Sequence, residues 1–160
     1  GPMVRRFEEK FVAYLGVQEV IGLTSCTAAL HLALLRYGIG PGDEVLVPAH
    51  TFVATCSAVV NAGATPVLVD VTDEFNIDVS KIEPAITRST RAIIPVHLSG
   101  WMADMSAIMR IAKAHNLIVV EDACQSLSST NIFLSVVGFG GLIHFLLFIL
   151  KQLQPALLNR

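Results

Sequence analysis

The stretch LIVVEDACQS, residues 117–126, decides the fold of this chain. Four apolar residues lead directly into Glu121 and Asp122, and small residues follow them. An apolar run of this kind is typical of a strand that is buried on both faces, and a carboxylate at its end costs free energy unless it has a partner. Either both carboxylates are exposed and have no role, or Asp122 meets a cationic partner in a cleft.

Similar apolar stretches alternate with helical patterns along the rest of the chain. The predicted strands are EVIGLTS (19–25), EVLVPA (44–49), TPVLVDV (65–71), RAIIPVHL (91–98) and LIVVEDA (117–123). The spacing of apolar residues predicts helices over 4–15, 27–38, 52–63, 78–87 and 104–116. Asp78 and Asp104 are expected as N-caps, and Gly16, Gly38 and Gly63 as helix ends.

This alternation predicts an α/β fold with three layers (α/β/α), in which helices cover both faces of a mostly parallel sheet. In such sheets, ligands bind beyond the carboxyl ends of the strands. The residues that follow each predicted strand are therefore the candidates for a functional site.

The charges and cysteines of the chain exclude several classes of protein. With 11 Lys and Arg against 13 Asp and Glu, the net charge of −2 gives no electrostatic basis for a nucleic-acid partner. Cys26, Cys56 and Cys124 show neither paired nor metal-ligand spacing. We therefore expect no disulfide framework, no metal site, and a location in the reducing cytoplasm.

Small hydroxyl residues follow the first predicted strand, in TSCTAAL, where a helix begins. The free backbone N–H groups at a helix start can bind an anion such as phosphate, and Ser25 and Thr27 would add hydroxyl donors. A plain N-cap is the competing interpretation of this motif.

Further candidates lie at the ends of the other strands. Phe52 follows the loop PAHT, His97 lies near the end of RAIIPVHL, and Asp122 and Gln125 end the last strand. An aromatic residue at the place of Phe52 more often belongs to the core, and a lone histidine such as His97 is more often a structural hydrogen-bonding residue than a catalyst. Taken together, a phosphate-binding turn, an aromatic side chain and a buried Asp suit pyridoxal phosphate, whose pyridine nitrogen needs a carboxylate to stay protonated.

The order and spacing of these motifs resemble the DegT/DnrJ/StrS family of sugar aminotransferases, which have the aspartate-aminotransferase type of fold. The resemblance covers residues 5–127 and rests on TSCTAALHLAL, YGIGPGDEVLVPAHTFVATCSAVVNAGATPVLVDV, FNIDVSKIEPAIT, TRAIIPVHLSG and DMSAIMRIAKAHNLIVVEDACQS. It implies that an amino group moves from glutamate or glutamine to a keto-sugar nucleotide, in the biosynthesis of amino sugars for cell-envelope polysaccharides. The complete family member is expected to be a homodimer that uses pyridoxal 5'-phosphate.

The resemblance also implies which residues hold the cofactor's phosphate. Ser25, Thr27 and the backbone at Cys26 would do so. The family usually has Gly at the position of Cys26, so a cysteine there would crowd the phosphate or require a strained backbone. Cys124 is a milder departure, since the family more often has Ala there.

The remaining roles concern the cofactor's ring. By resemblance, Phe52 would stack on the ring, Asp122 would bind the pyridine nitrogen, and Gln125 would bind the ring's 3-oxygen. His97 would lie near the pocket as a catalytic candidate.

The last part of the chain departs from the family. From Ala123 to Leu150 there is no Asp, Glu, Lys or Arg. Lys151 stands about where the family's cofactor-binding lysine would fall, and it is the candidate for that catalytic role, although the residues before it do not match. We expect an N-terminal helix at 1–16, the cofactor-binding part of a truncated large domain at 17–128, and an aberrant apolar tail at 129–160, with the C-terminal small domain absent.

Several interpretations of this tail stay open. A shifted reading frame or a truncated gene model would make the chain an aminotransferase fragment. Alternatively, the chain is a non-catalytic remnant, or a membrane-anchored α/β domain, because residues 132–150 are apolar over a length that can cross a bilayer. The family resemblance favours the fragment, so we expect little or no aminotransferase activity and no membrane partner.

Overall fold

The computed structural model describes residues 1–16, 19–126, 134–138 and 146–150 of the chain. The helices are α1 (Pro2–Leu15), α2 (Cys26–Arg36), α3 (Val53–Asn61), α4 (Val79–Ala85) and α5 (Met105–His115), with a short 3₁₀ turn η1 (Leu98–Gly100). The strands are β1 (Glu19–Leu23), β2 (Glu44–Pro48), β3 (Thr65–Val69), β4 (Thr90–Ile93), β5 (Ile118–Val119), β6 (Glu121–Ala123), β7 (Leu134–Gly138) and β8 (Leu146–Leu150).

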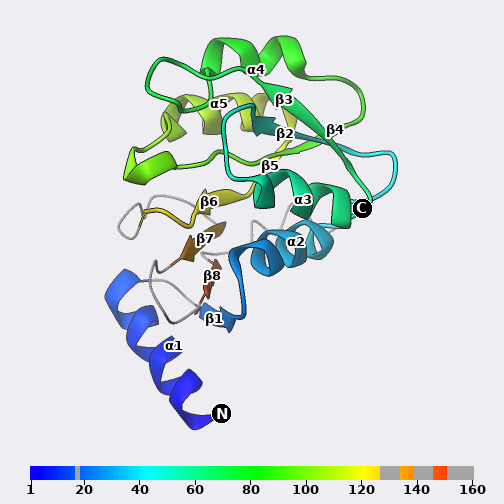
Figure 1. The fold of residues 1–160 in the computed structure, drawn as a ribbon. Helices are drawn as coiled ribbons and strands as arrows, with labels where there is room; N and C mark the ends of the chain where they lie inside the picture. Colours follow the sequence, from blue (N-terminus) through cyan, green and yellow to red (C-terminus); the bar gives the residue numbers. More distant parts are fainter. Residues whose placement is uncertain (17–18, 127–133, 139–145, 151–160) are drawn as a thin grey trace.

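The strands form two sheets of four (Figure 1). The first has the order β3-β2-β4-β5, and all its neighbouring strands are parallel. The second has the order β1-β8-β7-β6, in which β6 and β7 are parallel while β8 runs antiparallel to both β7 and β1. The predicted mostly parallel sheet is confirmed, and β8 is the antiparallel exception among the described strands.

The two sheets meet where the chain leaves β4 and passes beside β6. Val96 and Asp122 form a parallel bridge at this junction. The backbone N–H of Asp122 donates to the Pro95 carbonyl at 2.9 Å, and the N–H of His97 donates to the Asp122 carbonyl at 3.1 Å. The backbone of Asp122 is therefore held by hydrogen bonds at the junction of the two sheets.

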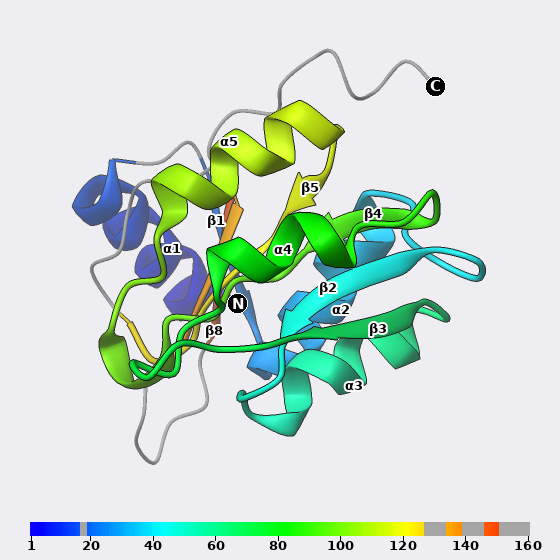
Figure 2. The ribbon, with the colours of Figure 1, turned by 90° about the horizontal axis from the view of Figure 1, so that it is seen from above.

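Helices cover both faces of the sheet, as Figure 2 shows from above. Helices α2 and α3 pack on one face, and α4 and α5 lie on the other. Successive side chains of a strand point to opposite faces, so Val45 and Val47 belong to the core beside α2 and α3, while Leu46 belongs to the core beside α4 and α5. The predicted three-layer α/β fold is thus confirmed.

The helix starts follow the predicted capping residues. The Asp78 carboxylate accepts a hydrogen bond from the Ser80 N–H at 2.9 Å, and Asp104 accepts one from the Ala107 N–H at 3.0 Å. These bonds satisfy N–H groups that the first turn of a helix leaves without a backbone partner. Helix α1 ends at Gly16, whose left-handed backbone (φ 63°) is readily available to glycine.

The segment predicted as an apolar tail contributes β7 and β8 to the sheet, between β6 and β1. Within residues 132–150 the structure describes two strands, β7 and β8. None of the helices in the described part of the chain is both long and apolar enough to span a membrane.

Candidate functional site

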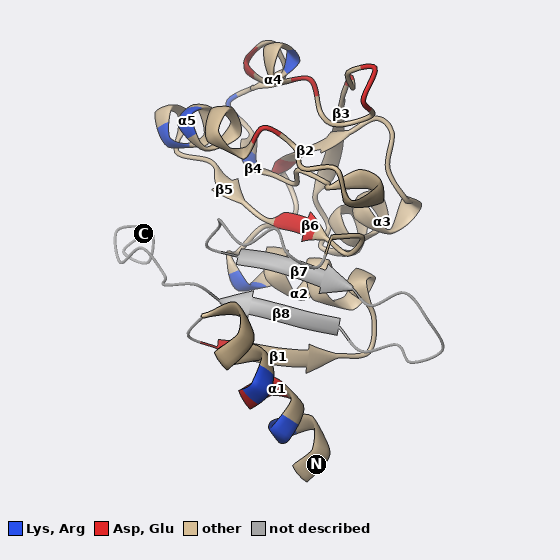
Figure 3. Cartoon of the chain, turned by 90° about the vertical axis from the view of Figure 1, so that its left-hand side faces the viewer, with Lys and Arg blue, Asp and Glu red and all other residues tan. Residues whose placement is uncertain are grey.

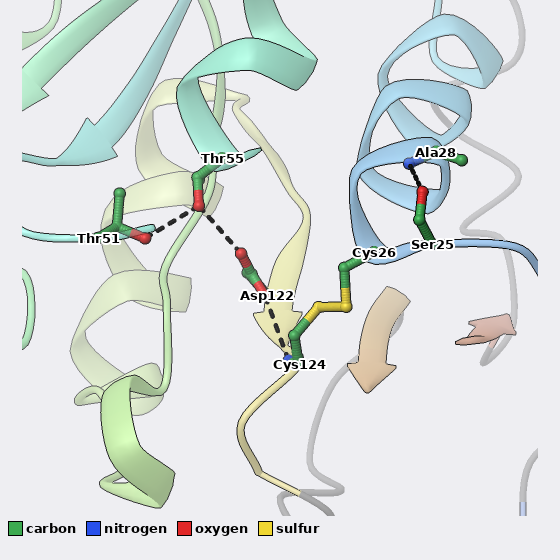
Figure 4. Close-up of a disulfide and its surroundings, with 7 residues drawn as sticks. All are labelled: Ser25, Cys26, Ala28, Thr51, Thr55, Asp122 and Cys124. Carbon is green, nitrogen blue, oxygen red and sulfur yellow. Dashed lines mark hydrogen bonds between the residues drawn. A yellow bond between two sulfur atoms is a disulfide. The ribbon is translucent and has the colours of Figure 1, made fainter. Parts of the chain in front are cut away.

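Asp122 is a buried carboxylate on β6, and its two oxygens have different partners. Its Oδ2 accepts a hydrogen bond from the Thr55 hydroxyl of α3 at 3.1 Å, and its Oδ1 accepts one from the Cys124 N–H at 3.2 Å (Figure 4). Only 6% of the residue is exposed. A carboxylate oxygen can accept two hydrogen bonds, so this arrangement fixes the side chain and leaves capacity for a further donor.

Burial raises the pKa of Asp122 above its ordinary range. Three smaller effects lower this pKa: the hydrogen bond from the Cys124 N–H, the hydrogen bond from Thr55, and the nearby His97. Burial outweighs them. The ionised carboxylate is therefore costly in this place, and an adjacent cation would remove the cost.

Glu121, the neighbour of Asp122, faces a different partner. Figure 3 shows the acidic residues of β6 inside the fold, away from the charged residues on α4 and α5. Glu121 is fully buried and pairs with the equally buried His97 through Oε1 and Nε2. The two carboxylates are therefore neither exposed nor equivalent, because Glu121 is held inside the fold by His97, and Asp122 is held by Thr55 and Cys124.

The ring of His97 is engaged at both nitrogens. Its Nδ1 accepts a hydrogen bond from the Ala103 N–H at 3.2 Å, so the ring proton of the neutral form lies on Nε2 and is donated to Glu121. His97 also holds the Asp122 carbonyl through its backbone N–H. His97 therefore has a structural role, in holding Glu121 and the backbone of Asp122. The catalytic role that the resemblance implies for it stays a prediction.

The start of α2 is capped in the way that the competing N-cap interpretation of TSCTAAL predicts. Ser25 is the N-cap, and its Oγ accepts a hydrogen bond from the Ala28 N–H at 3.1 Å. Thr27 lies in the first turn and is half-buried. The cap satisfies one of the N–H groups of this turn, and the binding of an anion there stays a prediction.

Cys26 and Cys124 form a disulfide, which contradicts the prediction that the chain has none. Their Cα atoms lie 6.5 Å apart, although the residues are 98 positions apart in the sequence. Sequence spacing does not reveal such a pair, because it is the fold that brings the start of α2 beside the end of β6. Cys56 is a free thiol.

The bridge also brings together residues that sequence analysis placed in one site. Ser25 and Asp122 are neighbours of the two bridged cysteines, and Figure 4 shows the disulfide running between the two groups.

Phe52 stands at the N-cap position of α3 and is 69% exposed, so its ring is free of the core. Lys151, the candidate for the cofactor-binding lysine, lies outside the described residues.

Gln125 lies two residues beyond the end of β6, against the turn that follows His97. Its side-chain Oε1 accepts a hydrogen bond from the Ser99 N–H at 2.6 Å. Ser99 has a positive φ of 53°, a backbone conformation that costs free energy in a residue other than glycine. Because the carbonyl oxygen of Gln125 is used in this way, its amide NH₂ is the group available to donate to a ligand.

Thr55 and Thr51 are residues of the site that the sequence analysis missed. The Thr55 hydroxyl has one proton, which it donates to Asp122, so it accepts from the Thr51 hydroxyl at 2.9 Å. Thr55 is fully buried in an otherwise apolar helix face. Thr51 lies in the loop before α3 and Thr55 in its first turn, so their contact depends on the conformation of that loop, which local patterns do not reveal.

Curated relatives share most of the chain. A GDP-perosamine synthase from Caulobacter vibrioides is 48% identical over 131 residues, which are 81% of this chain and 35% of that protein. A UDP-N-acetyl-3-dehydro-alpha-D-glucosamine 3-aminotransferase from Acidithiobacillus ferrooxidans is 46% identical over 157 residues, which are 98% of this chain and 42% of that protein. The chain thus spans well under half the length of these relatives.

Solved structures share the fold and the family. The crystal structure of DesV from S. venezuelae superposes with a TM-score of 0.89 at 38% identity, covering 98% of this chain and 46% of that one. The structure of NtdA from Bacillus subtilis with bound cofactor PMP gives a TM-score of 0.90 at 36% identity, covering 96% of this chain and 38% of that one. The model of the DegT/DnrJ/EryC1/StrS aminotransferase family matches residues 1–142, and the chain therefore belongs to this family.

Proposed function

We propose that this chain forms the cofactor-binding part of a pyridoxal-phosphate-dependent aminotransferase that acts on keto-sugar nucleotides. The observation that carries the proposal is the position of Asp122. It is buried in the middle of β6, its pKa is raised by burial, and the Cys26–Cys124 bridge joins the end of its strand to the N-terminus of α2. A carboxylate and a helix start beside each other match the two ends of this cofactor.

The donor and acceptor groups of the chain fit pyridoxal phosphate. Asp122 would hold the proton of the pyridine nitrogen, and the positive charge of that ring would lower the cost of burying the carboxylate. Bound in this way, the cofactor supplies an electron sink for the transfer of an amino group. Thr55 and the Cys124 N–H keep the carboxylate in one orientation for this contact.

The other candidate residues would bind the rest of the cofactor. Ser25, Thr27 and the backbone of Cys26 would hold the phosphate at the start of α2, where N–H groups and the helix dipole favour an anion. The amide NH₂ of Gln125 would donate to the ring's 3-oxygen. The exposed ring of Phe52 would lie against the cofactor's ring.

The names of the relatives support a sugar-nucleotide substrate. They include a GDP-perosamine synthase, a UDP-linked aminosugar aminotransferase and a dTDP-3-amino-3,4,6-trideoxy-alpha-D-glucose transaminase. These names contain three different nucleotides, so we propose a sugar nucleotide as the substrate class without specifying its base. Glutamate or glutamine is the proposed amino donor.

Further parts of the proposal concern the complete protein. We propose that it forms a homodimer in the cytoplasm, and that Lys151 is its cofactor-binding lysine. The proposed division remains a helix at 1–16, a cofactor-binding part at 17–128 and a tail at 129–160.

The test is binding of pyridoxamine phosphate, whose amine does not react with lysines as the aldehyde of pyridoxal phosphate does. Equilibrium dialysis of the reduced chain is expected to show binding that Asp122→Asn weakens, because a neutral amide cannot balance the pyridinium charge. Asp73→Asn is the matched control, since it removes the same charge from an exposed turn and should leave binding unchanged. Equal affinity of the two variants would contradict the role of Asp122.

A further inference from the structure

The Cys26–Cys124 disulfide joins the two parts of the proposed cofactor site. Cys26 is the first residue of α2, next to the cap Ser25, and Cys124 is two residues beyond Asp122. Figure 4 shows the two sulfurs in the space between the end of β6 and the start of α2. A cofactor held by its phosphate at α2 and by its ring nitrogen at Asp122 has to span this same space.

We propose that Cys26 and Cys124 are a redox-modification site that controls cofactor binding, and that low-molecular-weight thiols such as glutathione act on it. In the oxidised chain, the two sulfurs obstruct the path between the phosphate-binding turn and Asp122, and the bridge fixes the distance between the elements that carry them. In the reduced chain, the cysteine side chains can turn away and the cofactor can enter. This inference rests on the proposed function, because it assumes that the cofactor binds there.

The chemistry is thiol–disulfide exchange. A thiolate of the reductant attacks one protein sulfur, the Sγ–Sγ bond breaks, and the released cysteine thiolate takes up a proton. A second reductant thiolate then attacks the first reductant sulfur, releasing the other cysteine, which is also protonated, and leaving the reductant as a disulfide. Two electrons pass from the reductant to the protein, and glutathione disulfide drives the same exchange in reverse.

The exposure of the three cysteines fits this assignment. Cys26 and Cys124 are both half-buried, so the bridge is not sealed inside the core and a small thiol can reach it. Cys56 lies in α3 and is a free thiol, and burial raises its pKa, which disfavours the reactive thiolate. Cys56 therefore serves as an internal reference that shares the chain but not the site.

The experiment compares the chain after treatment with dithiothreitol and after treatment with glutathione disulfide, each reagent being removed before measurement. Mass spectrometry after alkylation counts the reactive thiols, and equilibrium dialysis measures pyridoxamine phosphate binding. We expect Cys26 and Cys124 to be alkylated only in the reduced chain, and the reduced chain to bind at least roughly tenfold tighter.

Two variants separate the possible outcomes. Cys124→Ala is expected to bind equally after both treatments, while Cys56→Ser is expected to keep the difference seen in the unmodified chain. Three results would overturn the redox control and leave the proposed function standing. They are equal affinity of the oxidised and reduced chain, tighter binding by the oxidised chain, and free Cys26 and Cys124 thiols after oxidation. Absence of binding in every form, Cys124→Ala included, would overturn both.

Discussion

At the scale of single residues, the orientation of Asp122 depends on a chain of two hydroxyl groups. Thr51 donates to Thr55, and Thr55 donates to Oδ2 of Asp122. The hydrogen bond from Thr55 also opposes the effect of burial on the pKa of Asp122. Thr55 therefore both orients the carboxylate and favours its ionised form.

Thr55→Val is expected to weaken the binding of pyridoxamine phosphate to the reduced chain. Valine keeps the shape of threonine but removes a hydrogen bond to a charged group, which is worth about 1.5–3 kcal/mol, or roughly tenfold to a hundredfold in affinity. The pKa of Asp122 should also rise further, so binding should be lost at a higher pH on the acid side.

Equilibrium dialysis across a pH series measures both effects. Thr55→Ser is the matched variant, because it restores the hydroxyl and should restore the affinity and the acid limit together. A Thr55→Val chain that binds as the unmodified chain does at every pH would contradict the positioning role.

The raised pKa of Asp122 also predicts how stability depends on pH. Because burial raises the pKa in the folded chain, the folded state keeps this proton at pH values where the unfolded state has lost it. The contribution of Asp122 to the free energy of unfolding therefore falls as pH rises from the ordinary carboxyl value through the raised one. Above that window, Asp122 is ionised in the folded chain without cofactor, and the free energy of unfolding is lowered by the whole cost of burying that charge.

Urea unfolding of the unmodified chain and of Asp122→Asn measures this contribution. The difference between the two free energies should move in favour of Asp122→Asn as pH rises through the window, since the amide does not ionise. The exposed Asp73→Asn should show no such trend. A difference between chain and variant that is constant with pH would show that Asp122 ionises normally in the folded state.

Single residues differ in how far the sequence could predict them. Asp122 was identifiable because a charged residue directly after an apolar run stands out, whereas Thr55 looks like any helical threonine until β6 is placed beside it. The pairing of Glu121 with His97 was hidden for the same reason, since 24 positions separate the partners. A contact between distant elements depends on topology, which local patterns do not encode.

At the scale of elements, the bridge between α2 and β6 determines how firmly the two are held together. The disulfide closes a loop of 98 positions, and constraining a loop of that length limits the freedom of the unfolded chain. Reduction is therefore expected to lower the free energy of unfolding by about 2–4 kcal/mol.

Urea unfolding with and without dithiothreitol measures the effect of the bridge. Cys26→Ser should unfold at the same urea concentration under both conditions, and Cys56→Ser should behave as the unmodified chain. Equal midpoints for the oxidised and reduced unmodified chain would show that the bridge does not hold α2 and β6 together.

The elements themselves were largely predictable, but the single strand predicted over 117–123 is two strands, β5 and β6, which belong to different sheets. Asp78 and Asp104 cap their helices as predicted, because the carboxylate accepts a hydrogen bond from a backbone N–H of the first helical turn. This hydrogen bond is local and needs no tertiary contact. The pairing of Cys26 with Cys124 has no such local sign.

At the scale of the whole molecule, the apolar segment after residue 128 has a partner in the fold. β7 lies beside β6, and β8 lies between β7 and β1. Apolar residues without charges are typical of strands that are covered on both faces as well as of membrane segments. Composition alone does not separate these two cases.

The last prediction concerns the aminotransferase activity of the 160-residue chain. Such a reaction needs a lysine amine at the cofactor, and Lys10, Lys81 and Lys113 are exposed on helices α1, α4 and α5. Lys151 is therefore the candidate, and the chain spans only 35% of the Caulobacter relative. The residues before Lys151 do not match the family pattern, and a misplacement of about 1 Å can cost on the order of a hundredfold in rate. We expect the chain to bind cofactor when reduced but to show little or no turnover with glutamate and GDP-, UDP- or dTDP-linked keto-sugars.

Two results would contradict this expectation. Turnover that disappears in Lys151→Ala but survives in the control Lys113→Ala would show that the chain is active and that Lys151 is the cofactor-binding lysine. Turnover that survives both changes would contradict the assignment of Lys151 as well.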